Sequence, residues 1–207
     1  MRAGNRLIRC PLCSLVAERP PAKRMNRKLL ILDLDETLIH GTERELGRSD
    51  DFRVDEYFVY KRPYVDEFLD FTKEHFDVAI WSSASEAYLA AVCARLIPQG
   101  FPLAFLWGRK RCIRKFNDEE QSYSFIKDLK KVKKIGFPLE QVIVVDDSPR
   151  KHQRNHGNLV RVKPFVGDLD DDELSLLMSY LPILAEESNV RTVEKRGWRA
   201  DTSKGKS

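Results

Sequence analysis

Two acidic residues, Asp33 and Asp35, directly follow the apolar run of residues 29–32, and their spacing suits shared acid chemistry. An isolated buried carboxylate is very costly, so we expect Asp33 where the predicted strand stops, at the rim of a sheet, where open α/β folds bind ligands. Two acids one residue apart can share a hard cation and divide the roles of nucleophile and acid/base. Asx turns and helix N-caps use the same residues, so the chemical interpretation needs partners elsewhere in the chain.

Three other segments supply such partners, each at a predicted strand end or helix start. If parallel strands joined by right-handed crossovers gather their carboxyl ends at one edge, these segments converge on the two acids. Their side chains offer hydroxyls, an ammonium group and two further carboxylates. The candidates are Ser82, Ser83, Lys127, Asp146 and Asp147.

Phosphoryl transfer needs an in-line nucleophile, neutralised phosphoryl oxygens and a protonated leaving group. In this scheme Asp33 attacks and forms an aspartyl-phosphate, while Asp35 protonates the leaving oxygen and later activates water. Ser82 is expected to bind the phosphoryl group through its hydroxyl and backbone N–H, and Lys127 to hold the negative charge.

An oxygen-rich Mg²⁺ site is the second part of the scheme. Asp33, Asp147 and Asp35, the last through its backbone carbonyl, are the expected ligands, with Asp146 in support. Simpler interpretations exist: the serines could cap a helix, the lysine could belong to a solvated helix face, and the second acidic pair could form a turn. The placement of every element at one edge favours catalysis.

The elements that must position these residues alternate along the chain. Such alternation predicts an α/β fold with a doubly wound, mostly parallel sheet and a small hairpin insertion, without a large cap. Strands are expected at residues 28–35, 76–81, 103–107, 141–145 and 159–162, and the hairpin at 52–54 and 57–60, after a polar loop at 41–51. Helices are expected after Pro63 and at 86–96, 124–135 (with Gly136 as C-cap) and 171–187, with Pro182 as a break.

Composition limits the class of protein. The 207 residues are 42% hydrophobic and 33% charged, which is typical of a globular chain with one core. No stretch approaches the roughly 20 apolar residues of a membrane span, and no signal peptide is evident. Together with four cysteines expected to be reduced thiols, this predicts a cytoplasmic protein that has no membrane partner.

Charge divides the chain unevenly, although the net charge is only +4. Residues 1–28 carry eight Lys or Arg residues against Glu18 alone. We expect residues 1–26 to be a basic, poorly ordered extension, residues 27–192 the phosphatase-like domain, and residues 193–207 a flexible tail.

Two further patterns were weighed. Cys10 and Cys13 have the spacing of half a zinc knuckle, but no second pair of ligands follows. The basic run of residues 109–115 suits an electropositive rim for an acidic or phosphorylated substrate. A nucleic-acid patch is less favoured because few stacking aromatics interleave with the run, and an ordinary solvated loop remains an alternative.

The acidic motifs together resemble the haloacid dehalogenase superfamily of aspartyl phosphatases. Residues 33–38 (DLDETL) and 144–149 (VVDDSP) carry this resemblance. Residues 60–69, 126–129 and 171–174 are similar to the small C-terminal-domain phosphatase branch, also called NLI-interacting-factor-like phosphatases. The resemblance spans about residues 28–192 and implies the roles given above, Mg²⁺ as cofactor, and Ser82, Lys127 and Arg109 around the substrate phosphate. Ser83, next to Ser82, is a further candidate for binding the substrate.

The chain departs from this branch at three places. Ser82, Ser83 and Ala84 stand where Thr-Ala-Ser is usual, Asp147 stands where Asn is common, and the insertion between the first two motifs is short. A site without a closing cap suits a phosphorylated side chain on a protein, so a phosphoprotein is the expected substrate. A small-molecule phosphatase of the same superfamily and a non-catalytic phosphate-binding module are the alternatives.

Overall fold

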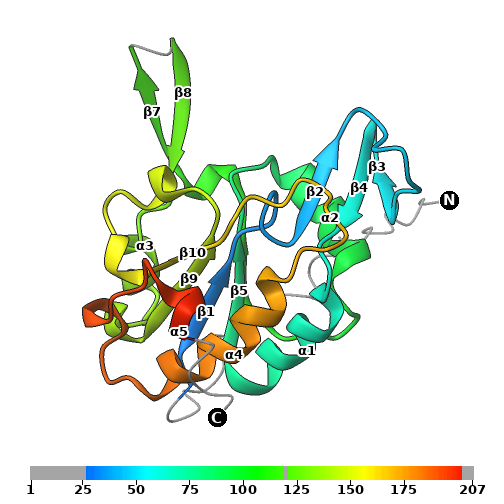
Figure 1. Cartoon of the computed structure of the whole chain (residues 1–207). Helices are drawn as coiled ribbons and strands as arrows, with labels where there is room; N and C mark the ends of the chain where they lie inside the picture. The colour runs from blue at the N-terminus through cyan, green and yellow to red at the C-terminus, as the bar shows by residue number, and fades with distance from the viewer. Residues whose placement is uncertain (1–26, 119–120, 202–207) are drawn as a thin grey trace, which may run out of the picture.

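The structure is a computed structural model that describes residues 27–118 and 121–201. The predicted extension at 1–26, with Cys10 and Cys13, lies outside these residues. A central five-stranded sheet is parallel throughout, in the order β10-β9-β1-β5-β6 (Figure 1), so the predicted α/β fold class is confirmed. Its strands are β1 (Leu29–Leu32), β5 (Asp77–Trp81), β6 (Leu103–Trp107), β9 (Val142–Asp146) and β10 (Leu159–Arg161).

Side chains of β1 alternate between the two faces of this sheet. Leu30 and Leu32 belong to the larger core cluster, whereas Leu29 and Ile31 belong to a smaller cluster on the opposite face. Burial on both faces explains why this strand is uniformly apolar. The larger cluster is covered by α1 (Val65–His75), α2 (Glu86–Leu96) and α4 (Glu173–Glu186), and the smaller one by α3 (Lys130–Lys134).

A three-stranded antiparallel sheet forms the insertion after β1. Its order is β2-β4-β3, and the predicted hairpin supplies two of its strands. The loop expected at 41–51 is wrong at its start, because Gly41 and Thr42 pair with β4. Their partners lie 17 residues or so along the chain, so local composition does not reveal the pairing. The strands are β2 (Ile39–Thr42), β3 (Phe52–Val54) and β4 (Tyr57–Lys61).

A second hairpin follows β6 and stands out from the body of the molecule (Figure 1). It consists of β7 (Ile113–Asn117) and β8 (Ser122–Ile126), paired antiparallel. The helix predicted over residues 124–135 is therefore wrong in its first half. Residues 124–126 complete a strand because they pair across the hairpin, and only α3 is helical. Gly136, predicted to end that helix, has a φ of 103°.

The C-terminal segment is longer in the folded unit than the sequence predicts. Pro182 lies inside α4 and does not break it, because buried leucines on both sides of it pack into the core. Residues 193–201, predicted as the start of a flexible tail, include the buried Trp198. Its ring lies 5.5 Å from that of Tyr180, and its indole N–H donates to the carbonyl of Arg161 at 2.8 Å.

The carboxyl ends of β1, β5 and β9 meet at one edge of the central sheet. In Figure 1 this edge lies between the insertion sheet and the β7–β8 hairpin. No helix among the described residues is long and apolar enough to cross a membrane. Short connections complete the fold: η2 (Arg109–Arg111), η3 (Leu139–Gln141), η4 (Pro149–His152), η5 (His156–Asn158), η6 (Val190–Thr192) and the four-residue α5 (Trp198–Asp201).

Candidate active site

Asp33 is fixed at the end of β1 by neighbours on both sides. Its N–H donates to the carbonyl of Val145 at 2.9 Å, which continues the pairing with β9. Oδ1 accepts the N–H of Leu34 at 2.8 Å and lies 2.9 Å from the Nζ of Lys127, while Oδ2 lies 2.6 Å from the Nζ of Lys151. This carboxylate is only 1% exposed, so the two ammonium groups compensate a charge that water barely reaches.

Asp146 ends β9 and is fully buried beside Asp33. Its Oδ2 lies 2.6 Å from the Nζ of Lys127 and 2.8 Å from Nε2 of His152, and Oδ1 accepts the N–H of Ser148 at 2.9 Å. Burial alone would raise the pKa of Asp146, but Lys127 and His152 together hold that pKa well below its usual range. Asp146 is therefore an anion whose oxygens are already engaged, which suits a residue that positions Lys127.

Lys127 joins the two strand ends. Its side chain is 1% exposed and its Nζ contacts both Asp33 and Asp146. The residue follows β8 directly rather than lying on a helix as predicted, and its N–H donates to the carbonyl of Lys151 at 2.8 Å. This hydrogen bond ties the β8 end to η4 and holds both lysines at the same edge.

Three carboxylates lie close enough to hold one cation. Oxygens of Asp33, Asp146 and Asp147 all lie within 4.8 Å of one another. Among the described residues, the buried Oδ1 of Asp147 has no hydrogen-bond partner, and the Nζ of Lys151 lies 3.7 Å away. Burial, with the charges of Asp146 and Asp33, raises the pKa of Asp147 to about 6. An oxygen donor set with one unsatisfied carboxylate oxygen fits a hard divalent cation such as Mg²⁺.

Asp35 faces away from that cluster, toward α2. Its Oδ1 accepts the hydroxyl of Tyr88 at 3.0 Å, and its Oδ2 accepts the hydroxyl of Ser82 at 3.3 Å. Burial and the charge of Asp33 raise the pKa of Asp35. A carboxyl group that keeps its proton to higher pH can serve as a general acid.

The loop that carries Asp35 is held from behind by Arg62. Its buried guanidinium donates to the carbonyls of Thr37 at 3.0 Å and Lys163 at 2.9 Å. The same group makes two hydrogen bonds of 2.6 and 2.7 Å to Asp171. Two segments that resemble the phosphatase branch, 60–69 and 171–174, therefore meet behind the site and brace its loop.

Ser82 and Arg109 differ in part from their expected roles. The N–H of Ser82 donates to the carbonyl of Trp107 at 2.9 Å as part of the sheet, so its predicted use for phosphate is wrong. Its hydroxyl remains at the site. Arg109 is exposed at the rim, where its Nε donates to the carbonyl of Ser83 at 2.8 Å and its guanidinium lies 5.0 Å from the Phe125 ring centroid.

A comparison with known families decides the relationship. The family model described as NLI interacting factor-like phosphatase matches residues 28–191. The chain belongs to this family. The motifs predicted this membership, and with it the C-terminal-domain phosphatase branch of the haloacid dehalogenase superfamily and a phosphatase activity of that type.

Individual relatives agree with this assignment. CTD nuclear envelope phosphatase 1 homolog of Drosophila melanogaster is 30% identical over 187 residues, covering 83% of this chain and 73% of that protein. The human CTD small phosphatase-like protein is 28% identical over 193 residues, covering 86% of this chain and 66% of that protein. A beryllium fluoride-bound variant of the fission yeast RNA polymerase II CTD phosphatase Fcp1 has the same fold, with a TM-score of 0.51 and 17% identity over 86% of this chain and 50% of that one.

Three residues of this NLI interacting factor-like phosphatase were missed from the sequence: Tyr88, Lys151 and His152. Each touches at least one of the predicted carboxylates. Lys151 and His152 follow the second acidic pair by four to six positions, inside a short turn, and that nearness was the available signal. No sequence signal pointed to Tyr88, because it lies in α2, far along the chain from Asp35.

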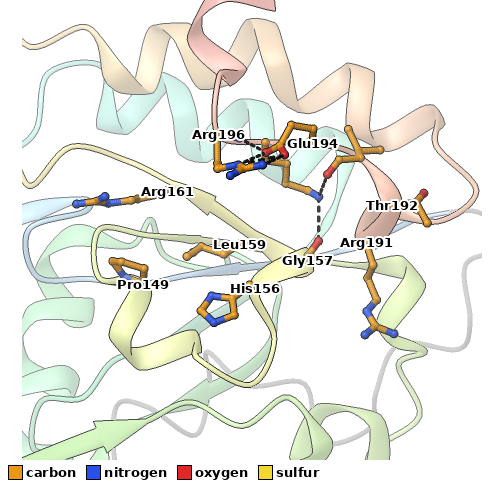
Figure 2. A pocket seen from close by; sticks show the side chains of 11 residues that line it. Pro149, His156, Gly157, Leu159, Arg161, Arg191, Thr192, Glu194 and Arg196 are labelled. Carbon is orange, nitrogen blue, oxygen red and sulfur yellow. Dashed lines mark hydrogen bonds and ion pairs between the residues drawn. The ribbon is translucent and has the colours of Figure 1, made fainter.

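Two hollows flank the sheet edge of the phosphatase. One, of about 800 Å³, lies between the β7–β8 hairpin and η4 and includes Ser83 and Lys151. The other, of about 590 Å³, lies behind η4 against the C-terminal segment (Figure 2). Only the first is lined by Lys151, which contacts Asp33, so it is the hollow that opens toward the carboxylates.

Proposed function

We propose that this chain is a Mg²⁺-dependent phosphomonoester hydrolase that works through an aspartyl-phosphate on Asp33 and acts on phosphoserine or phosphothreonine in proteins. One observation carries the proposal. Asp33 is a buried carboxylate bracketed by Lys127 and Lys151, while Asp35 stands beside it with a raised pKa. A nucleophile held next to ammonium groups can approach a phosphate dianion, and a protonated neighbour can release its alcohol.

The reaction divides into two displacements at phosphorus. A carboxylate oxygen of Asp33 forms a bond to phosphorus as the bond to the substrate oxygen breaks, and Asp35 gives its proton to that oxygen. Water then attacks the phosphorus, Asp35 takes its proton back, and the bond to Asp33 breaks to release phosphate. Lys127 offsets negative charge at Asp33 throughout, and the hydroxyl of Ser82 keeps Asp35 oriented.

Asp33 and Asp147, with the backbone carbonyl of Asp35, are the residues proposed to hold Mg²⁺, and Asp146 supports them through Lys127. When bound, Mg²⁺ neutralises charge on the phosphoryl oxygens and supplies Lewis acidity. The unsatisfied oxygen of Asp147 supports this assignment.

A protein substrate fits the open edge better than a metabolite does. The insertion between Ile39 and Arg62 has only 24 residues, and these form a three-stranded sheet beside the site rather than a cap domain over it. Water exclusion around a small substrate needs closure, whereas a phosphorylated side chain brings its own protein surface. The cytoplasmic location predicted from the sequence stays part of this proposal, supported by the free thiols of Cys93 and Cys112.

Hydrolysis of p-nitrophenyl phosphate with and without Mg²⁺ tests the enzymatic part. Wild type is expected to turn over only with Mg²⁺, and Asp33→Asn to lose at least about 10³-fold in kcat/KM. Equal rates for the two proteins would contradict the mechanism, and an inactive wild type would favour a phosphate-binding module. Comparable turnover of phosphopeptides and of a panel of small phosphomonoesters would contradict the protein substrate.

A further inference from the structure

The hollow of about 800 Å³ between the β7–β8 hairpin and η4 forms a groove. The residues of these two elements that lie away from the carboxylates have no role in the proposed reaction. The hairpin contributes Lys115, Phe116 and Phe125, and the opposite wall contributes Ser148 and Arg150. The hydrogen bond from the N–H of Lys127 to the carbonyl of Lys151 joins the two walls at the base of the groove. Lys151 lines the groove and its Nζ lies 2.6 Å from Oδ2 of Asp33, so the inner end of the groove lies next to the proposed nucleophile.

The hairpin carries aromatic rings that the body of the protein does not cover, and one of them, Phe116, lines the groove. Phe116 is 40% exposed and Tyr123 is 50% exposed, and their ring centroids lie 4.9 Å apart at the end of the hairpin. The guanidinium of Arg114 lies 3.4 Å from the centroid of the Tyr123 ring. Exposed aromatic side chains with cations beside them are common where proteins bind partners.

The charge of the groove favours an acidic occupant. Lys115 and Arg150 are exposed in its walls, and Asp118 is the acid among the described residues that line it. Lys151, at the inner end, is already paired with Asp33 and lies 3.7 Å from both Asp146 and Asp147. Lys115 and Arg150 would attract a negatively charged ligand, which would raise its association rate and favour it over a neutral one. Basic residues of β7 and η2, which include Arg109 at the rim, extend the same sign of potential around the entrance.

The length of the hairpin sets the length of the occupant. Each of its strands has five residues, which spans about 16 Å. That length accommodates roughly five residues of extended chain next to the residue whose phosphate lies at Asp33.

We propose that this groove is a docking site for an extended acidic segment adjoining the phosphorylated residue of the substrate protein. The proposal rests on the phosphatase function above and adds the recognition chemistry to it: carboxylates of the substrate meet Lys115 and Arg150, and an apolar side chain packs on Phe116. The enzyme thus selects substrates that have acidic residues next to the phosphorylated residue. The hairpin, and not the insertion sheet, binds those acidic residues.

The hollow behind η4 is a weaker candidate for substrate docking, because none of the active-site carboxylates or lysines lines it and its own cations contact neighbouring groups. Arg196 pairs with Glu194 at 2.7 Å, and Arg191 lies 3.7 Å from Glu140. The ammonium group of Lys195 donates to the backbone carbonyls of Gly157, Val190 and Val193. These contacts leave that surface little charge for a ligand.

The test uses the full chain and matched phosphoserine peptides of about 11 residues. One peptide carries Asp and Glu beside the phosphoserine, one carries Asn and Gln, and one carries Lys. Wild type is expected to hydrolyse the acidic peptide with a kcat/KM about tenfold above the neutral one, mostly through KM, and high salt should narrow the difference.

Charge reversal in the groove supplies the decisive variant. Lys115→Glu combined with Arg150→Glu should remove the preference for the acidic peptide, while the matched reversal Lys133→Glu with Lys134→Glu on α3 should keep it. The ratio of acidic-peptide to p-nitrophenyl phosphate kcat/KM should fall about tenfold in the groove variant only. Binding of the same peptides to the Asp33→Asn protein, followed by fluorescence anisotropy, should show the same order without turnover.

Each contrary outcome has a distinct meaning. If wild type hydrolyses all three peptides equally well, the docking proposal fails and the phosphatase function stands. If both double variants lose the preference alike, the effect is general electrostatics and the groove is not the site. If a single-stranded oligonucleotide displaces the acidic peptide and binds more tightly, the groove serves nucleic acid instead. If p-nitrophenyl phosphate and peptides both resist wild type, the proposed function itself fails.

Discussion

The ends of β1 and β9 each carry two acidic residues, and within each pair the two carboxylates differ in the same way. Asp33 and Asp146 are buried and held by ammonium groups, whereas Asp35 and Asp147 are half-buried and have raised pKa values. The first member of each pair is thus paired with ammonium groups, and the second is set to exchange a proton or bind a cation. Identical side chains take different roles because their surroundings differ in burial and charge.

The two ends also differ from each other. One residue separates Asp33 from Asp35, and the chain turns at Glu36, whose φ is 57°, so Asp35 points toward α2. Asp147 directly follows Asp146 and stays beside the other carboxylates. The β1 end is therefore suited to proton transfer and the β9 end to charge neutralisation, and variants at the half-buried positions should separate these two functions.

The largest effect is expected at the β1 end. Asp35→Asn should lower kcat for a phosphoserine peptide about 10²–10⁴-fold, because the leaving oxygen loses its proton donor. In wild type the raised pKa of Asp35 means that activity falls only as pH rises through that pKa. Steady-state rates across pH 4 to 9 measure both quantities.

Tyr88→Phe is the matched control for that variant. The hydroxyl of Tyr88 lowers the pKa of Asp35. Its removal should therefore shift the high-pH limb of the pH–rate profile to higher pH, while the enzyme stays active. An Asp35→Asn enzyme with normal kcat and an unchanged profile would show that the two ends do not divide their work in this way.

A smaller effect is expected at the β9 end. Asp147→Asn should raise the Mg²⁺ concentration for half-maximal activity about tenfold at pH 7.5, because an amide oxygen replaces a carboxylate. In wild type, protons should compete with Mg²⁺ as pH falls through about 6, the pKa of Asp147. The variant should lack most of that competition. Calorimetric Mg²⁺ titrations at pH 5.5 and 7.5 would contradict this account if both proteins respond to pH alike.

The smallest effect is expected at Lys151, which lies between the two ends. Its ammonium group is 2.6 Å from Asp33 and 3.7 Å from both Asp146 and Asp147, and these carboxylates raise the pKa of Lys151 despite its burial. Lys151→Met should therefore cost about 2 kcal/mol of stability in chelator, since three carboxylates lose a counter-charge.

The same change should tighten Mg²⁺ binding a few-fold, because the metal no longer competes with an ammonium group. Thermal melts with chelator and with Mg²⁺ measure both effects, and Mg²⁺ should raise the Tm of the variant more than that of wild type. Lys134→Met, on the surface of α3, controls for loss of a positive charge. An equal Mg²⁺ response in wild type and variant would mean that Lys151 does not share the carboxylates with the metal.

The elements predicted best from the sequence were strands buried on both faces and a helix with clear local end signals. The strands β1, β5, β6 and β9 were found because their residues are apolar on both faces, and α2 was predicted with its observed bounds. The hairpin β7–β8 was missed because its strands pair with each other and not with the core, so its first strand read as part of a basic loop. Trp198 was placed in a flexible tail because its partners lie in β10 and α4.

The site follows the same division. The carboxylates after β1 and β9 meet at one edge because these strands are neighbours in the central sheet, and Lys127 reaches them from the end of β8. Tyr88 was missed because its contact with Asp35 depends on how α2 packs, which no local pattern records. Lys151 lies near the second acidic pair in the sequence, but that nearness does not reveal its contact with Asp33. The backbone role predicted for Ser82 was wrong because its N–H already pairs with β6.

The central claim is that Asp33 carries the phosphoryl group. Wild type mixed with ³²P-labelled phosphosubstrate and Mg²⁺, then quenched in acid within milliseconds, should retain hydroxylamine-labile label on the one peptide that contains Asp33. The Asp33→Asn protein, checked for an unchanged fold by circular dichroism, should retain none. Full turnover by wild type with no acid-stable label, or label on a peptide that lacks Asp33, would contradict the account.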